Sequence, residues 1–143
     1  MRKDILVGAV STTTWFAPGS TSVWKGSFAL VRESETALLM AHLKRAITRF
    51  ETEGFTVAQQ RALIKNPGLA DAYRGNQIDA FFKESVQLDP KLGHLEITPR
   101  FKFGPDVFDP AKVRWWDLTT PGEWQKHAEK YWLFGDGTPI FTK

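Results

Sequence analysis

Apolar residues recur at helical spacing in three consecutive stretches before residue 90. The first predicts an amphipathic helix over 34–53 that ends at Gly54. The second predicts a short helix over 57–65, because Thr56 is followed by a glutamine three residues later, as in a capping box. The third predicts a helix over 69–86 with one broad apolar face. We therefore expect this part of the chain to be helical.

After residue 90 the period of the apolar residues falls to two, which is typical of strands. The pattern predicts three successive strands, formed by 94–103 around Pro99, by 107–108 and by 113–118. Turn residues separate each strand from the next. Short strands that follow each other this closely are expected to pair within one sheet.

A final helix is expected over 121–132. Thr120, Pro121 and Glu123 match an N-cap, a first-turn proline and a capping-box glutamate. Residues 140–141 are expected to form a short last strand. The order helix, three strands, helix, strand predicts an α+β fold.

The N-terminal segment follows a different pattern. Residues 5–32 are rich in Val, Trp, Phe, Ser and Thr and are broken at 17–20, which predicts an extended hairpin or a loosely packed arm. We expect an N-terminal arm and helix over 1–56 and the functional core over 57–143, joined in one compact domain.

Composition narrows the classes of function. The 143 residues are 42% hydrophobic, carry a formal net charge of +3, and have a pI near 9.3, which permits binding to nucleic acid without requiring it. The absence of cysteine excludes disulfides, zinc-thiolate sites and thiol catalysis. No stretch approaches the roughly 20 apolar residues of a membrane-spanning helix.

Two aspartates carry the main candidate chemistry. Asp106 enters the second expected strand and Asp117 lies in the third, so adjacent strands bring both carboxylates to the same end of the sheet. Paired carboxylates suit a hard divalent cation such as Mg²⁺, which activates water against a phosphodiester. Asp79, on the third helix, is a third candidate ligand.

Each acid also has a structural interpretation. Asp106 can be a turn residue after proline, Asp109 is interpreted as a turn acid before proline, and Asp79 can lie on a solvated helix face. Asp117 is the hardest to explain without a partner, because a strand acid beside Trp115 and Trp116 would be costly to bury unpaired.

Residues near the last helix add candidate catalytic groups. His127 can shuttle a proton or contact phosphate, and Lys130 can stabilise charge from the same helix, although either can be a structural or solvated residue. Thr119 is expected on the same side as Asp117, where it can orient water or phosphate, whereas Thr120 is interpreted as a helix cap.

Candidate contacts to a nucleic-acid backbone are the cations Arg74, Lys102, Arg114 and Lys126, although isolated surface cations often have no specific role. The tryptophans at 115, 116 and 124 are interpreted as packing residues between sheet and helix, not as platforms for base stacking.

The element order and the two acids resemble the PD-(D/E)xK restriction-endonuclease-like superfamily. Pro105–Asp106 matches its first motif and Asp117–Thr119 occupies the second. The resemblance implies a restriction-endonuclease-like core, with an acid from the preceding helix near the metal. Where the superfamily places a lysine this chain has Thr119, and the resemblance implies that Lys130 or Lys126 replaces it from the neighbouring helix.

The amino-acid sequences of several segments also resemble those of C-terminal toxin domains of bacterial polymorphic toxins, of the Rhs and contact-dependent-inhibition type. These segments are 74–79, 104–106, 116–120 and His127 with Lys130 and Tyr131. The resemblance covers about 57–143. It implies secretion as part of a larger toxin, action in the cytoplasm of a target cell, and neutralisation by a cognate immunity protein.

The leading hypothesis is therefore an Mg²⁺-dependent nuclease toxin that hydrolyses DNA, or alternatively transfer RNA. A metal-independent ribonuclease that uses His127 and Lys130 with the RNA 2′-hydroxyl is a second hypothesis. A non-enzymatic protein-binding module, in which the carboxylates only cap turns, is a third.

Overall fold

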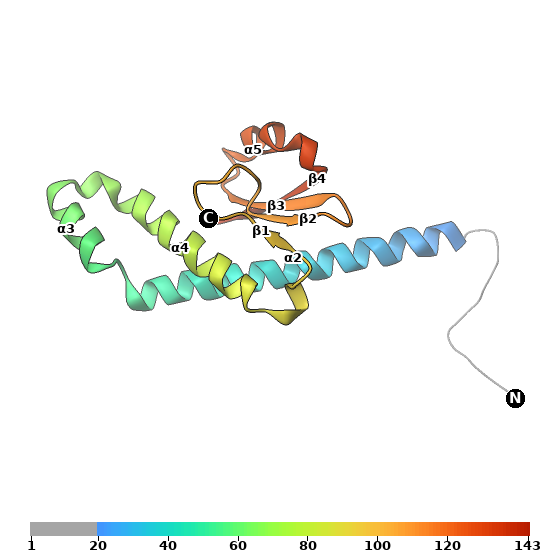
Figure 1. Ribbon diagram of the computed structural model, residues 1–143, viewed down its shortest axis with the longest axis horizontal. Helices are drawn as coiled ribbons and strands as arrows, with labels where there is room; N and C mark the ends of the chain where they lie inside the picture. Colours follow the sequence, from blue (N-terminus) through green and yellow to red (C-terminus); the bar gives the residue numbers. More distant parts are fainter. Residues whose placement is uncertain (1–19) are drawn as a thin grey trace, which may run out of the picture. The chain divides into compact units, whose positions relative to one another are not determined.

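The computed structural model describes residues 20–143, with side chains from residue 35 onward. The chain divides into two compact units, Met1–Glu35 and Thr36–Lys143. Helix α2 (Ser20–Glu53) has residues in both, and the other helices and strands of the described residues belong to the second unit (Figure 1).

The expectation of an extended arm over 5–32 was wrong for residues 20–32, which are helical. The remainder of that prediction, 5–19, lies outside the described residues. The Val, Trp and Phe residues of this segment suggested a strand. However, the scale of β-propensities spans only about 1 kcal/mol, and the preference of each residue depends on what its side chain packs against.

The other N-terminal helices form where the apolar spacing predicts them. Helix α3 (Val57–Lys65) has the expected capping box, in which the Gln59 backbone N–H donates to Thr56 Oγ1 (3.2 Å) and the Thr56 N–H donates to Gln59 Oε1 (2.9 Å). Helix α4 (Ala70–Gln87) buries one face, as expected. Short 3₁₀ turns precede and follow α4 at Pro67–Leu69 and Pro90–Leu92.

Four strands form one mixed sheet in the order β1-β2-β3-β4. The first three, β1 (Glu96–Ile97), β2 (Val107–Asp109) and β3 (Arg114–Thr119), form an antiparallel meander. After helix α5 (Trp124–Lys130) and a 3₁₀ turn at Trp132–Phe134, β4 (Asp136–Phe141) returns parallel to β3. The α+β class is confirmed. Among the described residues, no helix combines the length and apolar character needed to cross a bilayer.

Helices cover both faces of the sheet (Figure 1). On one side, α4 and the part of α2 from residue 36 onward pack against Val107, Trp116 and Ile140 to form the main core. On the other side, the Trp115 ring lies 5.5 Å from the rings of both Trp124 and Tyr131, at the two ends of α5. Trp115 and Trp116 are both buried, so their interpretation as packing residues is confirmed. With helices on both faces, β3 is buried at five of its six positions.

Two expected elements are shorter than the sequence suggested. Residues 101–103 are not in a strand, because Pro99 cannot donate to a strand ladder and Phe101 has a positive φ of 69°. The predicted cap at Thr120 was also wrong: α5 begins at Trp124, after a turn in which the Thr120 carbonyl accepts from the backbone N–H groups of residues 123 and 124.

A buried histidine connects α2 to the end of α4. His42 Nε2 donates to Asp89 Oδ2 at 2.7 Å, which leaves Nδ1 to accept from the Ser85 hydroxyl. Asp89 also accepts from the Lys91 backbone N–H at 2.9 Å. This hydrogen-bonded network fixes the end of α4, and with it the helix that carries the candidate site.

The parallel β3–β4 pair gives a test of the fold. Gly137 lies under the Trp115 ring, where a Cβ would stand only 2.3 Å from Cζ2. We expect Gly137→Ala to lower the free energy of unfolding by about 2 kcal/mol or more, because the ring and strand must shift apart. Gly122→Ala is the matched control, since its Cβ would meet nothing within 4 Å, and it should change stability by less than about 0.5 kcal/mol. Urea unfolding followed by tryptophan fluorescence measures both, and equal effects would contradict the packing described.

Candidate active site

A cavity of about 530 Å³ opens at one end of the sheet, bounded by α4, the loop between β1 and β2, β3 and α5. The ionisable residues that line it include Asp79 and Lys83 from α4, Asp117 from β3, and His127 from α5. Asp106, immediately before β2, completes the group. A cavity of this size lies within the range of about 300 to 1,000 Å³ that is typical of ligand sites.

Asp106 and Asp117 hold each other in place. Asp117 Oδ1 accepts from the Asp106 backbone N–H, and Asp106 Oδ2 accepts from the Leu118 backbone N–H, both at 2.8 Å. The antiparallel register explains this geometry. Since Val107 pairs with Trp116, the next position outward on each strand is Asp106 on one and Asp117 on the other. The two carboxylates thus meet at one end of the sheet, where the sequence pattern places them.

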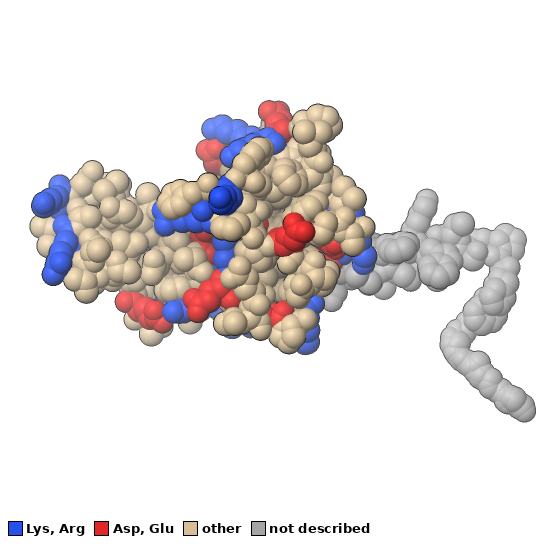
Figure 2. Space-filling view, viewed as in Figure 1, with Lys and Arg blue, Asp and Glu red and all other residues tan. Residues whose placement is uncertain are grey.

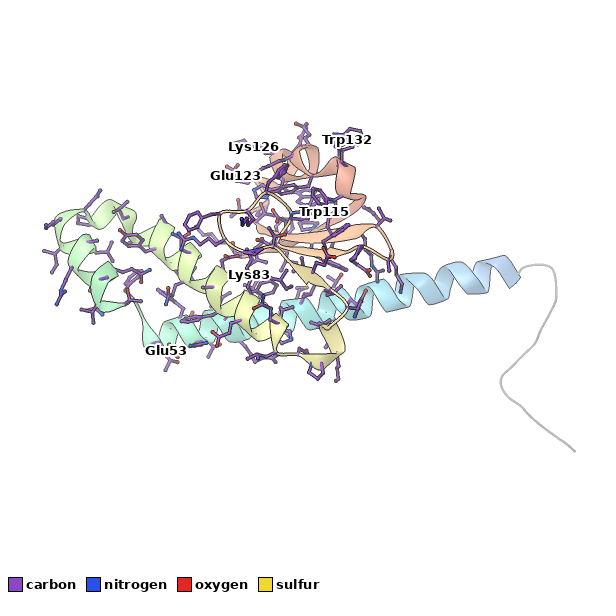
Figure 3. The ribbon with its side chains drawn as sticks, in the orientation of Figure 1. Glu53, Lys83, Trp115, Glu123, Lys126 and Trp132 are labelled. Atoms are coloured by element: carbon purple, nitrogen blue, oxygen red, sulfur yellow. The ribbon has the colours of Figure 1, made fainter. Side chains whose placement is uncertain are left out.

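Lys83 is the lysine of the site, and sequence reasoning missed it. Its ammonium group lies 2.8 Å from Asp106 Oδ1 and 3.2 Å from Asp79 Oδ1, and the side chain is largely buried. In Figure 3 it lies between α4 and the sheet. The sequence feature that could have identified Lys83 is its spacing of four residues from Asp79, which puts both side chains on one helix face.

The site holds more negative charge than its cation neutralises. Burial, and then the nearby charge of Asp106, raises the pKa of Asp117 to about 6, although hydrogen bonds from His127 and the Asp106 N–H oppose the shift. Burial and Asp106 also raise the pKa of Asp79. Burial acts to lower the pKa of Lys83, but the carboxylates of Asp106 and Asp79 outweigh it and raise that pKa. Lys83 is therefore a fixed positive charge.

His127 pairs with Asp117. Its Nδ1–H donates to Asp117 Oδ2, so Nε2 is the atom left to exchange a proton. The imidazole is about a third exposed and lines the cavity. Thr119 is buried at the cavity wall, and its hydroxyl donates weakly to the Thr120 carbonyl at 3.4 Å.

Of the cations expected to contact a nucleic acid, Arg74 and Lys102 line the cavity, and so do Arg100 and Lys143, which sequence reasoning did not select. Basic side chains also gather on the face seen in Figure 2, with acidic side chains among them. Outside the acidic centre, the cavity wall therefore carries these four cations and two further acids, Asp71 and Glu123. The excess of cations suits an anionic ligand.

The structure places the other expected cations away from the cavity. Arg114 is buried with its Nε 3.5 Å from Asp109 Oδ2, a placement that does not suit a phosphate contact. Asp109 itself accepts from the backbone N–H groups of residues 111 and 112, which confirms it as a turn acid.

Neither of the two substitute lysines lines the cavity. Lys126 is 75% exposed and pairs with Glu123, and in Figure 3 it lies on the outer side of α5. The Lys130 ammonium group lies 5.0 Å from the centre of the Tyr131 ring. Lys83 occupies the position beside the paired acids that the resemblance led us to expect for one of them.

Three of the acidic residues that line the cavity are the expected ligands of a divalent cation. Asp79, Asp106 and Asp117 line the cavity together with Asp71 and Glu123. Burial is the largest cause of the raised pKa values of Asp79 and Asp117, and the charge of Asp106 adds to it. Hard cations such as Mg²⁺ bind one or two carboxylates and keep several waters. Asp79, Asp106 and Asp117 are the residues that could hold it.

Comparison of the chain with protein-family models, with curated proteins and with solved structures found no significant match.

The pKa of Asp117 gives a prediction about stability. Its pKa of about 6 lies above the ordinary value of 3.8, so between these values the folded state binds more protons than the unfolded state. The contribution of Asp117 is then most favourable below pH 4 and is lost as the pH rises through 6. We expect Asp117→Asn to gain stability relative to the parent between pH 4.5 and 7.5, by up to about 3 kcal/mol.

The measurement is urea unfolding of both proteins across this pH range without added metal. Parallel pH profiles for the two proteins would contradict the raised pKa.

Proposed function

We propose that this chain is a metal-dependent nuclease, which hydrolyses phosphodiester bonds in DNA or, as the second choice of substrate, in transfer RNA. The observation that supports it most strongly is the pair of reciprocally hydrogen-bonded carboxylates, Asp106 and Asp117, with Asp79 in the same cavity. The order α4, β1, β2, β3, α5, β4 is the order expected of a restriction-endonuclease-like core, which we propose as the fold family.

Each residue has a role in this proposal. Asp79, Asp106 and Asp117 would hold the cation, which would supply a water of lowered pKa and offset the charge that develops on phosphate. Lys83 fixes the orientation of two carboxylates and places a positive charge beside the reacting phosphate. His127 exchanges a proton through Nε2, with its orientation set by Asp117. Arg74 and Lys102 contact flanking phosphates.

We also propose that the nuclease is the effector domain of an interbacterial toxin. It would be secreted as part of a larger protein, act in the cytoplasm of the target cell, and be neutralised by an immunity protein. This part of the proposal rests on the resemblance of the segments around Asp79, Asp106, Asp117 and His127 to polymorphic toxin domains.

One observation favours a second candidate function, a metal-independent ribonuclease. The pairing of Asp117 with His127 Nδ1 leaves a basic nitrogen at the cavity, as a general base for the RNA 2′-hydroxyl requires. In that case the carboxylate of Asp117 orients the imidazole. RNA alone would then be cleaved, and removal of metal would have no effect.

Metal dependence separates the two candidates. We expect cleavage of plasmid DNA or of total RNA with Mg²⁺, and its loss in EDTA. Asp117→Asn should lower the rate roughly 100-fold or more, because it removes a ligand and the partner of His127. Glu129→Gln, on the exposed side of α5, is the matched control. Independently of activity, Mg²⁺ should raise the melting temperature of the parent and not of Asp117→Asn. Cleavage of RNA that persists in EDTA would establish the ribonuclease instead.

The role of Lys83 can be tested by comparing its substitution with substitutions of the two lysines of α5, Lys126 and Lys130. We expect Lys83→Gln to lower the cleavage rate roughly 100-fold, since it removes the buried charge between Asp79 and Asp106. Lys126→Gln and Lys130→Gln should retain the parent rate. Stabilisation of Lys83→Gln by Mg²⁺, followed by thermal melting, would show that the variant is folded and still binds metal. An active Lys83→Gln together with an inactive Lys130→Gln would place the essential lysine on α5.

A further inference from the structure

The loop between β1 and β2 carries the alternating sequence Arg100-Phe101-Lys102-Phe103 along the wall of the cavity. The loop is anchored at both ends. The Thr98 N–H donates to the Asp106 carbonyl at 3.1 Å, and the Phe103 ring packs 5.5 Å from the Tyr131 ring. Within the loop, the Lys102 N–H donates to the Pro99 carbonyl at 3.1 Å and closes a turn. The backbone of this segment is thus held in one shape, beginning and ending beside the acidic site.

Phe101 is displayed at the tip of this turn. Its side chain is part of the cavity lining, yet the residue is 90% exposed. Its φ of 69° lies in the left-handed region, which is uncommon for a bulky residue. The Arg100 guanidinium lies 4.7 Å from the centre of the ring. Neither burial in the core nor backbone preference explains this position, so the ring is available to a ligand that enters the cavity.

The chemistry around Phe101 points to a flat, anionic ligand. A phenyl ring stacks on a nucleobase, and such stacking tolerates any base because each has a π-face. The cations Arg100, Lys102 and Arg74 line the same cavity and can contact phosphates on either side of that base. In an intact duplex both faces of a base are already stacked, so a ring at this position can reach a base face only where the strand is unpaired.

We propose that Phe101 stacks on an unpaired nucleobase next to the phosphodiester held at Asp106 and Asp117, and that the chain therefore acts on single-stranded or locally unpaired nucleic acid. This inference deepens the proposed nuclease function and rests on it. In this inference, the loop that carries Phe101 selects single-stranded or unpaired substrate, and the carboxylates take part in its cleavage.

Binding measured without cleavage tests the stacking directly. Fluorescence anisotropy in EDTA would use a labelled single-stranded DNA, a 2′-O-methyl RNA of the same sequence, and the matching DNA duplex. We expect the parent to prefer the single strands. Phe101→Ala should weaken single-strand binding roughly 5- to 150-fold, the range known for loss of one base–aromatic stack. Phe101→Trp should retain affinity, and Trp132→Ala, an exposed aromatic away from the cavity, should match the parent.

Phe101→Gly separates stacking from folding. Glycine accepts a positive φ freely, so this variant should melt no lower than the parent while losing single-strand affinity as Phe101→Ala does. A series of single-stranded DNAs, each with one abasic residue at a different position, locates the stacked base. At one position, loss of the base should weaken binding by the parent but not binding by Phe101→Ala.

Unchanged single-strand affinity in Phe101→Ala, or equal affinity of the parent for duplex and single strand, would overturn the inference. In that case a protein, such as an immunity protein with acidic groups, would become the expected partner of the ring. Cleavage assays distinguish the two proposals. Phe101-dependent binding without cleavage of any substrate would reject only the nuclease, whereas cleavage with Phe101-independent binding would reject only the stacking.

Discussion

Two backbone N–H groups, those of Asp106 and Leu118, each donate to a carboxylate on the opposite strand. This exchange compensates for the repulsion between the paired carboxylates, and it requires the exact pairing of β2 with β3 that sets Val107 against Trp116. A slip of one residue would turn every side chain of β3 to the other face and separate the acids. The buried tryptophans on opposite faces of β3 prevent that slip, so the packing of the core also fixes the geometry of the site.

The position of Asp117 in β3 also explains why the site lowers the stability of the fold. Asp117 alternates with Trp116 and Leu118 in a strand covered on both faces, and burial is the largest cause of its raised pKa. A chain under selection for stability alone would place an apolar residue there. That Asp117 pairs with His127 and lies beside a second acid, Asp106, which itself pairs with Lys83, is typical of a functional site.

The sequence predicted what depends on local pattern. Helices α3 and α4, the meander and the pairing of Asp106 with Asp117 follow from apolar periodicity and turn residues. Helix α2 before residue 34 did not follow, because its Val, Trp and Phe residues are compatible with helix or strand until their packing is known. Lys83 was missed for a related reason: on a helix of mixed charge, the sequence alone does not tell which lysine faces the sheet. Lys126 and Lys130 were favoured because the superfamily resemblance implied a substitute lysine on the helix next to the strand. In the structure that helix is α5, where Lys126 faces solvent and Lys130 lies beside aromatic rings.

The two candidate functions make opposite demands on Asp117 Oδ2. As a partner of His127 Nδ1 it orients an imidazole, and as a ligand it gives up part of that charge to a cation. The surrounding charge favours the second use. Lys83 pairs with both Asp79 and Asp106, and a bound divalent cation would relieve the repulsion from Asp106 that, after burial, contributes to the raised pKa values of Asp79 and Asp117. A ribonuclease that needed only an imidazole and its orienting acid would gain nothing from Asp79 and Asp106, whereas a metal site requires ligands of this kind.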